Sequence, residues 1–206
     1  QKRLEEIVIK IISDAVDATG ITNVAFTGGV FLNMIMNMKI QQKFGDKINL
    51  FFNPICNDHG NAVGAALEQC YQETGKNPVP PYMSLYLGNS YSDEEVVADS
   101  KKFNFKITRV NKVDTAIDLI ERGKVIGWFQ GRSEFGPRGL GNRSILSLAT
   151  DEKYKDTVNE KVKKREAWRP FCPTIIEEKS EEMLKDATYA PYMILGFEMK
   201  NPELYP

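Results

Sequence analysis

The 206-residue sequence has few cysteines and no long hydrophobic run. Its three cysteines, Cys56, Cys70 and Cys172, are far apart and form no CxxC pair, so we expect neither a disulfide framework nor a structural zinc site. Such sparse thiols fit a reducing cytoplasm. No segment approaches the roughly 18 apolar residues that a membrane span needs, so no membrane partner is expected.

The sequence also lacks an initiator methionine and the short apolar core of a secretory signal, because it opens with QKRLEEIVIK. We therefore expect a chain cut from a longer polypeptide, with the upstream remainder as a partner. The composition is 42% hydrophobic and 27% charged, which is typical of a globular protein with one large domain or two small ones.

The formal net charge of −1 conceals a basic segment, since residues 121–170 contain 12 Lys/Arg but only 7 Asp/Glu. Arginine binds phosphate or carboxylate through two parallel hydrogen bonds, so this segment is a candidate anion site. Its lysine-rich part, residues 153–164, has a second interpretation as a solvated charged face. A nucleic-acid surface is not expected, because the whole chain is slightly acidic.

The sequence of residues 1–80 predicts the order strand, glycine turn, helix, and this order occurs twice. Apolar spacing of three and four predicts an amphipathic helix over 3–18, and NVAFT predicts a strand over 23–27 followed by a helix over 30–44. A strand over 48–52 and a helix over 60–74 repeat the pattern. The segment TGKNPVPP at 74–81 cannot continue either element, so we predict two domains, 1–80 and 81–206.

The second part predicts strands over 85–87, 105–110, 125–129, 144–149 and 192–199. It predicts helices over 115–122, 151–166 and 179–187, and a further helix capped by Ser92 with Glu95 three residues later. The whole chain therefore predicts an α/β fold.

The first candidate site follows the two strands of residues 1–80. Gly28 and Gly29 deliver the chain into a helix, and free backbone N–H groups at such a turn bind anionic phosphate. A plain tight turn is the alternative. Asp58 follows the second strand, where α/β folds bind ligands, although it could equally cap the next helix.

The second candidate site is the arginine loop, residues 131–144, with the sequence GRSEFGPRGLGNRS. Glycines allow a ligand to approach the backbone closely, and arginines five or six residues apart can converge on one polyanion. We expect Glu134 to fix an arginine rather than to act as an acid. Downstream, VNEKVKKREAWRPFCP predicts a second basic cluster at Lys161, Lys164, Arg165 and Arg169. The alternative is an ordinary basic surface loop.

These motifs resemble those of the nodulation and antibiotic O-carbamoyltransferases. The resemblance is carried by TGGVFLN, NDHGNAVGAAL, LYLGNSYSDEE, GRSEFGPRGLGNRSIL and VNEKVKKREAWRPFCPTIIEE, and covers nearly the whole chain. It implies the C-terminal part of an actin-like ATPase (ASKHA) domain followed by a YrdC-like α/β twisted-sheet domain.

The resemblance also implies site residues. Gly28, Gly29 and Asn33 would line a nucleotide or carbamoyl-adenylate pocket, and Asp58 would bind a divalent metal, usually iron, with magnesium as the alternative. Carbamoyl phosphate would be activated by ATP on the basic face. The principal residues there would be Arg138, Arg143 and Arg169, supported by Arg132, Asn142, Ser144, Lys164 and Arg165.

The implied function is ATP-dependent O-carbamoyl transfer, through a carbamoyl adenylate, to a small-molecule hydroxyl acceptor. The family's metal histidines and its final sequence block lie outside these residues, so the chain alone is expected not to complete the reaction. A second copy of the chain is a candidate partner. Two alternatives are a sugar-kinase-like ATPase, which accounts for only the first third of the chain, and a YrdC-like RNA-binding module, whose affinity would fall steeply with salt.

Overall fold

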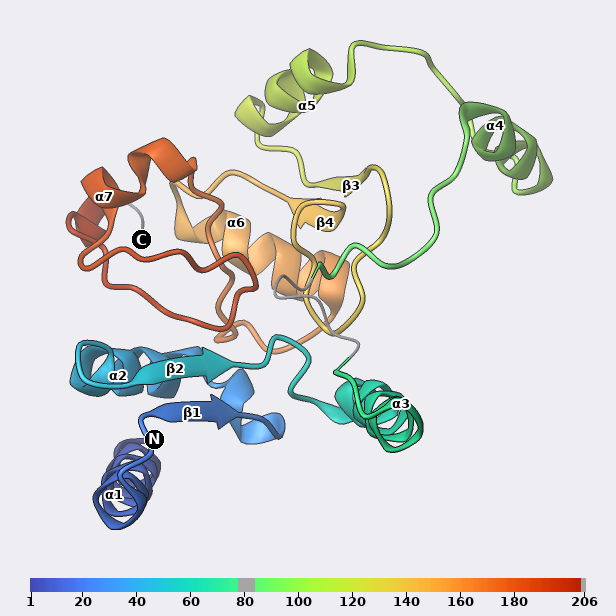
Figure 1. The fold of residues 1–206 in the computed structure, drawn as a ribbon. Coiled ribbons are helices and arrows are strands. Elements are labelled where there is room, and N and C mark those ends of the chain that lie inside the picture. The colour runs from blue at the N-terminus through green and yellow to red at the C-terminus, as the bar shows by residue number, and fades with distance from the viewer. Residues whose placement is uncertain (78–83, 205–206) are drawn as a thin grey trace. The chain divides into compact units, whose positions relative to one another are not determined.

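The computed structural model describes residues 1–77 and 84–204, which form helices and short strands of a mixed α/β chain (Figure 1). Contacts divide the chain into two compact units. The first unit comprises Gln1–Leu85, Phe135–Arg138 and Asp186–Glu198, and the second comprises Tyr86–Glu134, Gly139–Lys185 and Met199–Pro206. The predicted boundary between residues 80 and 81 lies outside the described residues.

The first unit contains the predicted strand, turn and helix pattern twice. Its elements are α1 (Lys2–Thr19), β1 (Asn23–Phe26), the 3-10 turn η1 (Gly29–Leu32), α2 (Met34–Phe44), β2 (Asn49–Phe52) and α3 (Asp58–Thr74). The helix predicted over 30–44 is divided between η1 and α2. The division follows from Asn33, whose Oδ1 accepts a hydrogen bond from the backbone N–H of Met36 at 3.1 Å and so begins a new helix.

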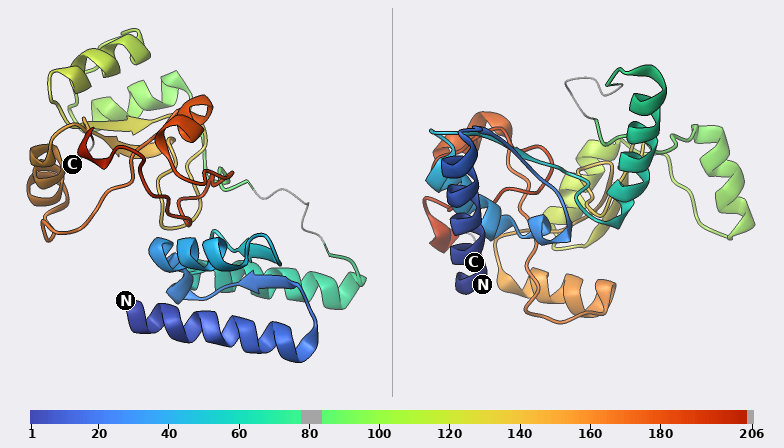
Figure 2. Two further views of the ribbon diagram at one scale, coloured as in Figure 1. Left: turned by 90° about the vertical axis from the view of Figure 1, so that its left-hand side faces the viewer. Right: turned by 60° about the horizontal axis from the view of Figure 1, so that its bottom comes forward.

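The sheet of the first unit is a parallel pair, in which Asn23 to Phe26 of β1 align with Asn49 to Phe52 of β2. The rings of Phe26 and Phe52 stack with centroids 4.8 Å apart, and α1 and α2 lie beside the pair (Figure 2). The buried core of this unit consists of Ile12, Phe26, Met36, Ile40, Phe44, Ile48, Phe52 and Ile194. Because Ile194 is part of this core, a segment close to the C-terminal end of the chain packs against the elements of residues 1–52.

The second unit is built around an antiparallel pair, β3 (Ile126–Phe129) and β4 (Arg143–Leu146), with Phe129 opposite Arg143. Its other elements are α4 (Asp93–Lys102), α5 (Lys112–Glu121), α6 (Glu152–Thr157), the π-helix η2 (Val158–Lys163), η3 (Glu177–Lys179), α7 (Ser180–Met183) and η4 (Pro202–Leu204). The capping box predicted at Ser92 and Glu95 is confirmed, because both reciprocal hydrogen bonds are present. Within the described residues, no helix combines the length and the apolar character that crossing a membrane requires.

Three predicted strands, over 85–87, 105–110 and 192–199, are wrong, because the structure describes no strand over any of them. At 85–87 the arginine loop provides the partners: Leu85 O accepts from Phe135 N, and Leu87 O accepts from the side chain of Arg132. Residues 105–110 have no partner strand among the described elements. In the last segment, Met193 has a positive φ of 58°, which interrupts an extended conformation.

Two predicted helices are shorter than expected. The helix over 151–166 becomes α6 and η2, and it ends where Lys164 adopts a left-handed conformation with φ 47°. The helix over 179–187 is reduced to η3 and α7, because Leu184 has an extended backbone and forms an isolated bridge with Met199.

Candidate functional site

The glycine-turn cavity lies in the first unit, where β1 and β2 end. Because parallel strands end at the same edge of their sheet, the segments after β1 and after β2 meet there. The cavity has a volume of about 460 Å³. Its lining residues are Thr27, Gly28, Gly29, Asn53, Cys56, Asn57, Asp58, Gly60, Asn61, Gly64 and Ala65.

Two glycines shape this cavity for identifiable reasons. Gly28 has a φ of 96°, a backbone conformation that other residues rarely adopt. Gly60 lies in the first turn of α3, where a Cβ atom would collide with the carbonyl oxygen of Ile55. The backbone that forms the cavity wall at these two positions therefore requires glycine.

Asp58 lies in the first turn of α3 and lines the cavity, and it is preceded by Asn57 as the N-cap residue. Asn57 Nδ2 lies 2.7 Å from His59 Nδ1. Asp58 is the only acidic residue in the cavity lining, and the described residues contain no cluster of three His, Cys, Asp or Glu side chains that could hold a metal ion. The residues present do not by themselves make a metal site.

Asn33 and Arg138 both lie in the first unit, outside the cavity lining. Asn33 caps α2, and its Nδ2 donates to Gln1 Oε1 at 2.8 Å. Arg138 Nη2 lies 3.5 Å from the carbonyl oxygen of Leu32. Burial raises the pKa of the Cys56 thiol, and the charge of Arg138 is among the effects that partly oppose this rise. Arg138 therefore lies close to the wall of the glycine-turn cavity.

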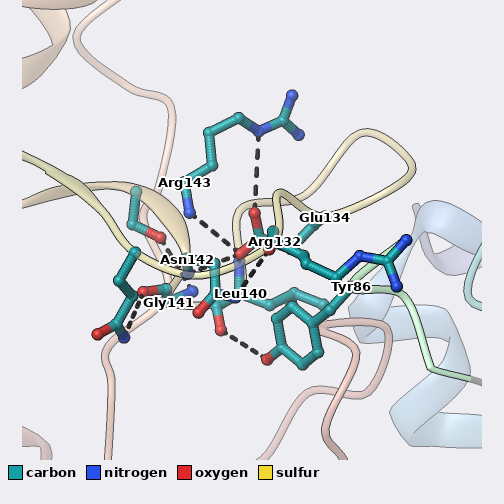
Figure 3. Close-up of polar contacts among 9 residues, drawn as sticks. Tyr86, Arg132, Glu134, Leu140, Gly141, Asn142 and Arg143 are labelled. Atoms are coloured by element: carbon teal, nitrogen blue, oxygen red, sulfur yellow. Dashed lines mark hydrogen bonds and ion pairs between the residues drawn. The ribbon is translucent and has the colours of Figure 1, made fainter. Parts of the chain in front are cut away.

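The part of the arginine loop that belongs to the second unit is organised by the buried carboxylate of Glu134 (Figure 3). Glu134 Oε1 accepts hydrogen bonds from three backbone N–H groups, those of Leu140 at 2.6 Å, Asn142 at 2.8 Å and Arg143 at 3.3 Å. Glu134 Oε2 lies 3.9 Å from Arg143 Nε. The carboxylate thus fixes mainly the backbone of the loop, and one arginine side chain more loosely.

Two opposing effects act on the pKa of Glu134. Burial raises it, but the hydrogen bonds from the loop N–H groups outweigh burial, so the pKa lies below the usual range of a glutamate. The lowered pKa favours the ionised form of Glu134, which accepts the hydrogen bonds of the loop backbone.

Other side chains predicted to bind substrate also brace this loop. Arg132 donates from Nε to Gly88 O at 2.8 Å and from Nη2 to Leu87 O at 2.9 Å. Asn142 Nδ2 donates to Arg132 O at 2.8 Å, and Ser144 Oγ accepts from Gly141 N at 3.0 Å. These bonds occupy part of the hydrogen-bonding capacity of each side chain.

The second basic cluster surrounds Asn159, a completely buried residue that sequence reasoning missed. Arg165 Nε donates to Asn159 Oδ1 at 2.7 Å, whereas the exposed Arg169 forms an ion pair from its Nε to Glu166 at 2.9 Å. Lys164 is exposed at the end of η2. The one available sequence signal for Asn159 was a neutral polar residue within a lysine-rich run.

The three arginines predicted as principal residues lie in different surroundings. Arg138 belongs to the first unit, whereas Arg143 lies beside Glu134 and Arg169 beside Glu166 in the second. Gly28, Gly29 and Asp58, which the sequence assigns to candidate sites, all line one cavity.

Two sequence models of one family match the chain. The model described as Carbamoyltransferase N-terminus matches residues 1–67, and the model described as Carbamoyltransferase C-terminus matches residues 117–204. These ranges include the glycine-turn cavity, the arginine loop and the second basic cluster.

Curated relatives match almost the whole chain. It is 38% identical to Nodulation protein NolO of Bradyrhizobium diazoefficiens, covering 94% of this chain and 36% of that protein. It is 36% identical to Nodulation protein NolNO of Sinorhizobium fredii, covering 90% and 28% respectively. An uncharacterized protein of Methanocaldococcus jannaschii is 33% identical, covering 98% and 34%. The chain therefore spans about a third of the length of these relatives.

Proposed function

The chain belongs to the carbamoyltransferase family, a family of transferases, and we propose that it takes part in ATP-dependent O-carbamoyl transfer. In the finer assignment, residues 1–80 belong to the C-terminal part of an actin-like ATPase domain and residues 81–206 to a YrdC-like domain. The glycine-turn cavity supports the first assignment, because it joins backbone N–H groups at a glycine turn to a carboxylate. The arginine loop supports the second.

The proposed reaction has two steps. Carbamoyl phosphate and ATP give carbamoyl adenylate, and both phosphate and pyrophosphate leave, so the balanced step consumes one water. In the second step the acceptor hydroxyl oxygen bonds to the carbamoyl carbon, AMP leaves and the hydroxyl proton is released.

The observation that carries this proposal is the anchored arginine loop. Two polyanions repel each other, so their reaction needs fixed positive charges that do not reorganise as negative charge develops. Glu134 holds the loop backbone through three hydrogen bonds, and the third of these comes from the N–H of Arg143, the first residue of β4. Arg138 and Arg169 would add positive charge, with Lys164 and Arg165 in support.

The remaining assignments are also proposals. Gly28 and Gly29 would present N–H groups to the nucleotide, with Asn33 nearby. Asp58 would supply one carboxylate to a divalent cation, iron or magnesium, whose other ligands would come from outside this chain. A hydroxyl compound would be the acceptor, and a second copy of the chain a candidate partner.

The test is pyrophosphate release by the full-length protein, supplied with ATP and carbamoyl phosphate. We expect release that requires both substrates. ATP hydrolysis that is indifferent to carbamoyl phosphate would refute the proposal in favour of a kinase-like ATPase. RNA binding that weakens steeply with salt, without pyrophosphate release, would favour the nucleic-acid alternative.

A further inference from the structure

Asn159 is a completely buried amide in the second unit, and all of its side-chain hydrogen-bonding groups have partners. Its Nδ2 donates to the carbonyl oxygens of Ala167 at 3.1 Å and Arg169 at 2.9 Å. Its Oδ1 accepts from Arg165 Nε at 2.7 Å. The Asn159 side chain therefore connects Arg165 with the backbone of residues 167 and 169.

The backbone around Asn159 explains how this is achieved. The π-helix η2 is wider than an α-helix, and it is followed by the left-handed residue Lys164. The chain then turns back, so that the N–H of Arg165 donates to the carbonyl oxygen of Asn159 at 3.0 Å. This turn wraps residues 165–169 around the Asn159 side chain.

The guanidinium group of Arg165 is contacted at its Nε edge and on one of its two faces. Asn159 occupies its Nε, and its guanidinium carbon lies 4.7 Å from the centroid of the Phe171 ring. Within the described residues, its two Nη groups have no hydrogen-bond partner. Those two groups can therefore form a bidentate pair of hydrogen bonds to an oxyanion.

Two other arginines of the second unit, Arg132 and Arg169, are held differently. Arg132 uses both Nε and Nη2 on backbone carbonyls, and Arg169 pairs with the exposed Glu166. A guanidinium that is fixed before the ligand arrives loses less side-chain entropy on binding. Arg165 is therefore better prepared to receive a phosphate than either of them.

We propose that Asn159 is a positioning residue that presents the guanidinium of Arg165 as a fixed fork to a phosphate group of the substrate. The inference rests on the proposed function for the identity of that substrate. It adds a residue outside the sequence-predicted set and ranks Arg165 above Arg169 as a direct contact.

A double-mutant cycle on the full-length protein tests the proposal. Asn159→Ala and Arg165→Lys should each raise the KM for carbamoyl phosphate or ATP by about tenfold, the scale of one charge-assisted hydrogen bond, with kcat nearly unchanged. The double variant should be no worse than Arg165→Lys alone, because Asn159 acts through Arg165. Multiplied effects on KM would overturn the proposal.

Two further variants separate positioning from folding. Asn159→Asp keeps an acceptor for Arg165 Nε but removes both N–H donors, so KM should return towards the wild-type value while Tm stays lowered. Asn37→Ala is the stability control, since Asn37 is equally buried and donates to the carbonyls of Phe31 and Ile194. If KM for Asn159→Asp stays as high as for Asn159→Ala, positioning is refuted.

Calorimetric binding of inorganic pyrophosphate supplies a readout that does not depend on turnover. We expect about tenfold weaker binding in Asn159→Ala and in Arg165→Lys, without further loss in the double variant. Unchanged affinity in Asn159→Ala would overturn the inference. A wild-type protein that binds pyrophosphate in this way but releases none from ATP would refute the proposed function alone.

Discussion

Glu134→Gln should loosen the arginine loop without unfolding the second unit. Glutamine keeps an oxygen for the three loop N–H groups but removes the negative charge. A hydrogen bond to a charged group contributes about 1.5–3 kcal/mol, against about 1 kcal/mol for a neutral one. The two shorter bonds, to Leu140 and Asn142, should each weaken by about 1 kcal/mol, or about 2 kcal/mol together.

The assay is amide hydrogen exchange at the three anchored N–H groups. A loss of about 2 kcal/mol corresponds to roughly 30-fold faster exchange when opening is rapid. The matched control is Glu152→Gln, because Glu152 is exposed and pairs with Lys155 on the surface. If exchange at these three groups in Glu134→Gln stays within about threefold of the wild-type rate, the charge of Glu134 does not stabilise the loop backbone.

The same variant gives a pH test. The pKa of Glu134 is lowered in the folded state, so its contribution to stability is present above the unfolded pKa of about 4.5. That contribution is lost as the pH falls through the lowered folded pKa. The difference in protection between wild type and Glu134→Gln should therefore shrink in acid, and a difference that is constant with pH would contradict the assignment.

Three further predictions concern the first unit. Arg138→Lys keeps the positive charge but loses the two-pronged guanidinium, so pyrophosphate release should fall about 30-fold to 150-fold. The control Lys153→Ala changes an exposed residue and should behave as wild type. If both variants behave as wild type, Arg138 does not bind a phosphate of the substrate. Gly60→Ala should lower the free energy of unfolding, measured by thermal denaturation, by about 1–3 kcal/mol, because the added Cβ meets the carbonyl oxygen of Ile55. Gly64 has open space for a Cβ, so Gly64→Ala should be neutral or stabilising by up to about 1 kcal/mol. Equal effects of the two substitutions would refute the close contact at Gly60. Asp58→Ala should lower the metal content of the full-length protein, and unchanged metal analysis would leave Asp58 as a residue of the helix N-terminus.

The helices and strands over residues 2–74 were largely predictable because each depends on local signals. The apolar spacing over 3–18 and the glycine after NVAFT define α1 and the end of β1. Gly28 and Asp58 line one cavity because each follows a strand and the two parallel strands end at the same edge. Local pattern and topology agree throughout this part of the chain.

The rest depended on hydrogen-bond partners that a periodic sequence pattern does not reveal. The segment 85–87 has strand-like composition, but the side chain of Arg132 takes up the carbonyls of Leu87 and Gly88. Asn159 lies in a run of charged residues, and its burial depends on the turn that follows it. Neither the contacts of Arg132 nor the turn around Asn159 is encoded in hydrophobic period or in local propensity.

The anchor at Glu134 has a consequence for how this loop can vary. Its three hydrogen bonds come from backbone N–H groups, which every amino acid except proline supplies. The side chains at positions 140 and 143 can therefore change while these backbone hydrogen bonds remain, whereas Asn142 also holds the loop through its Nδ2. The positive φ of Gly131, Gly136 and Gly141 and the close contact at Gly139 restrict substitution at those positions. The backbone path of the loop can thus persist through side-chain changes at a few defined positions, in natural divergence or in design, provided that the glutamate remains and no proline enters there.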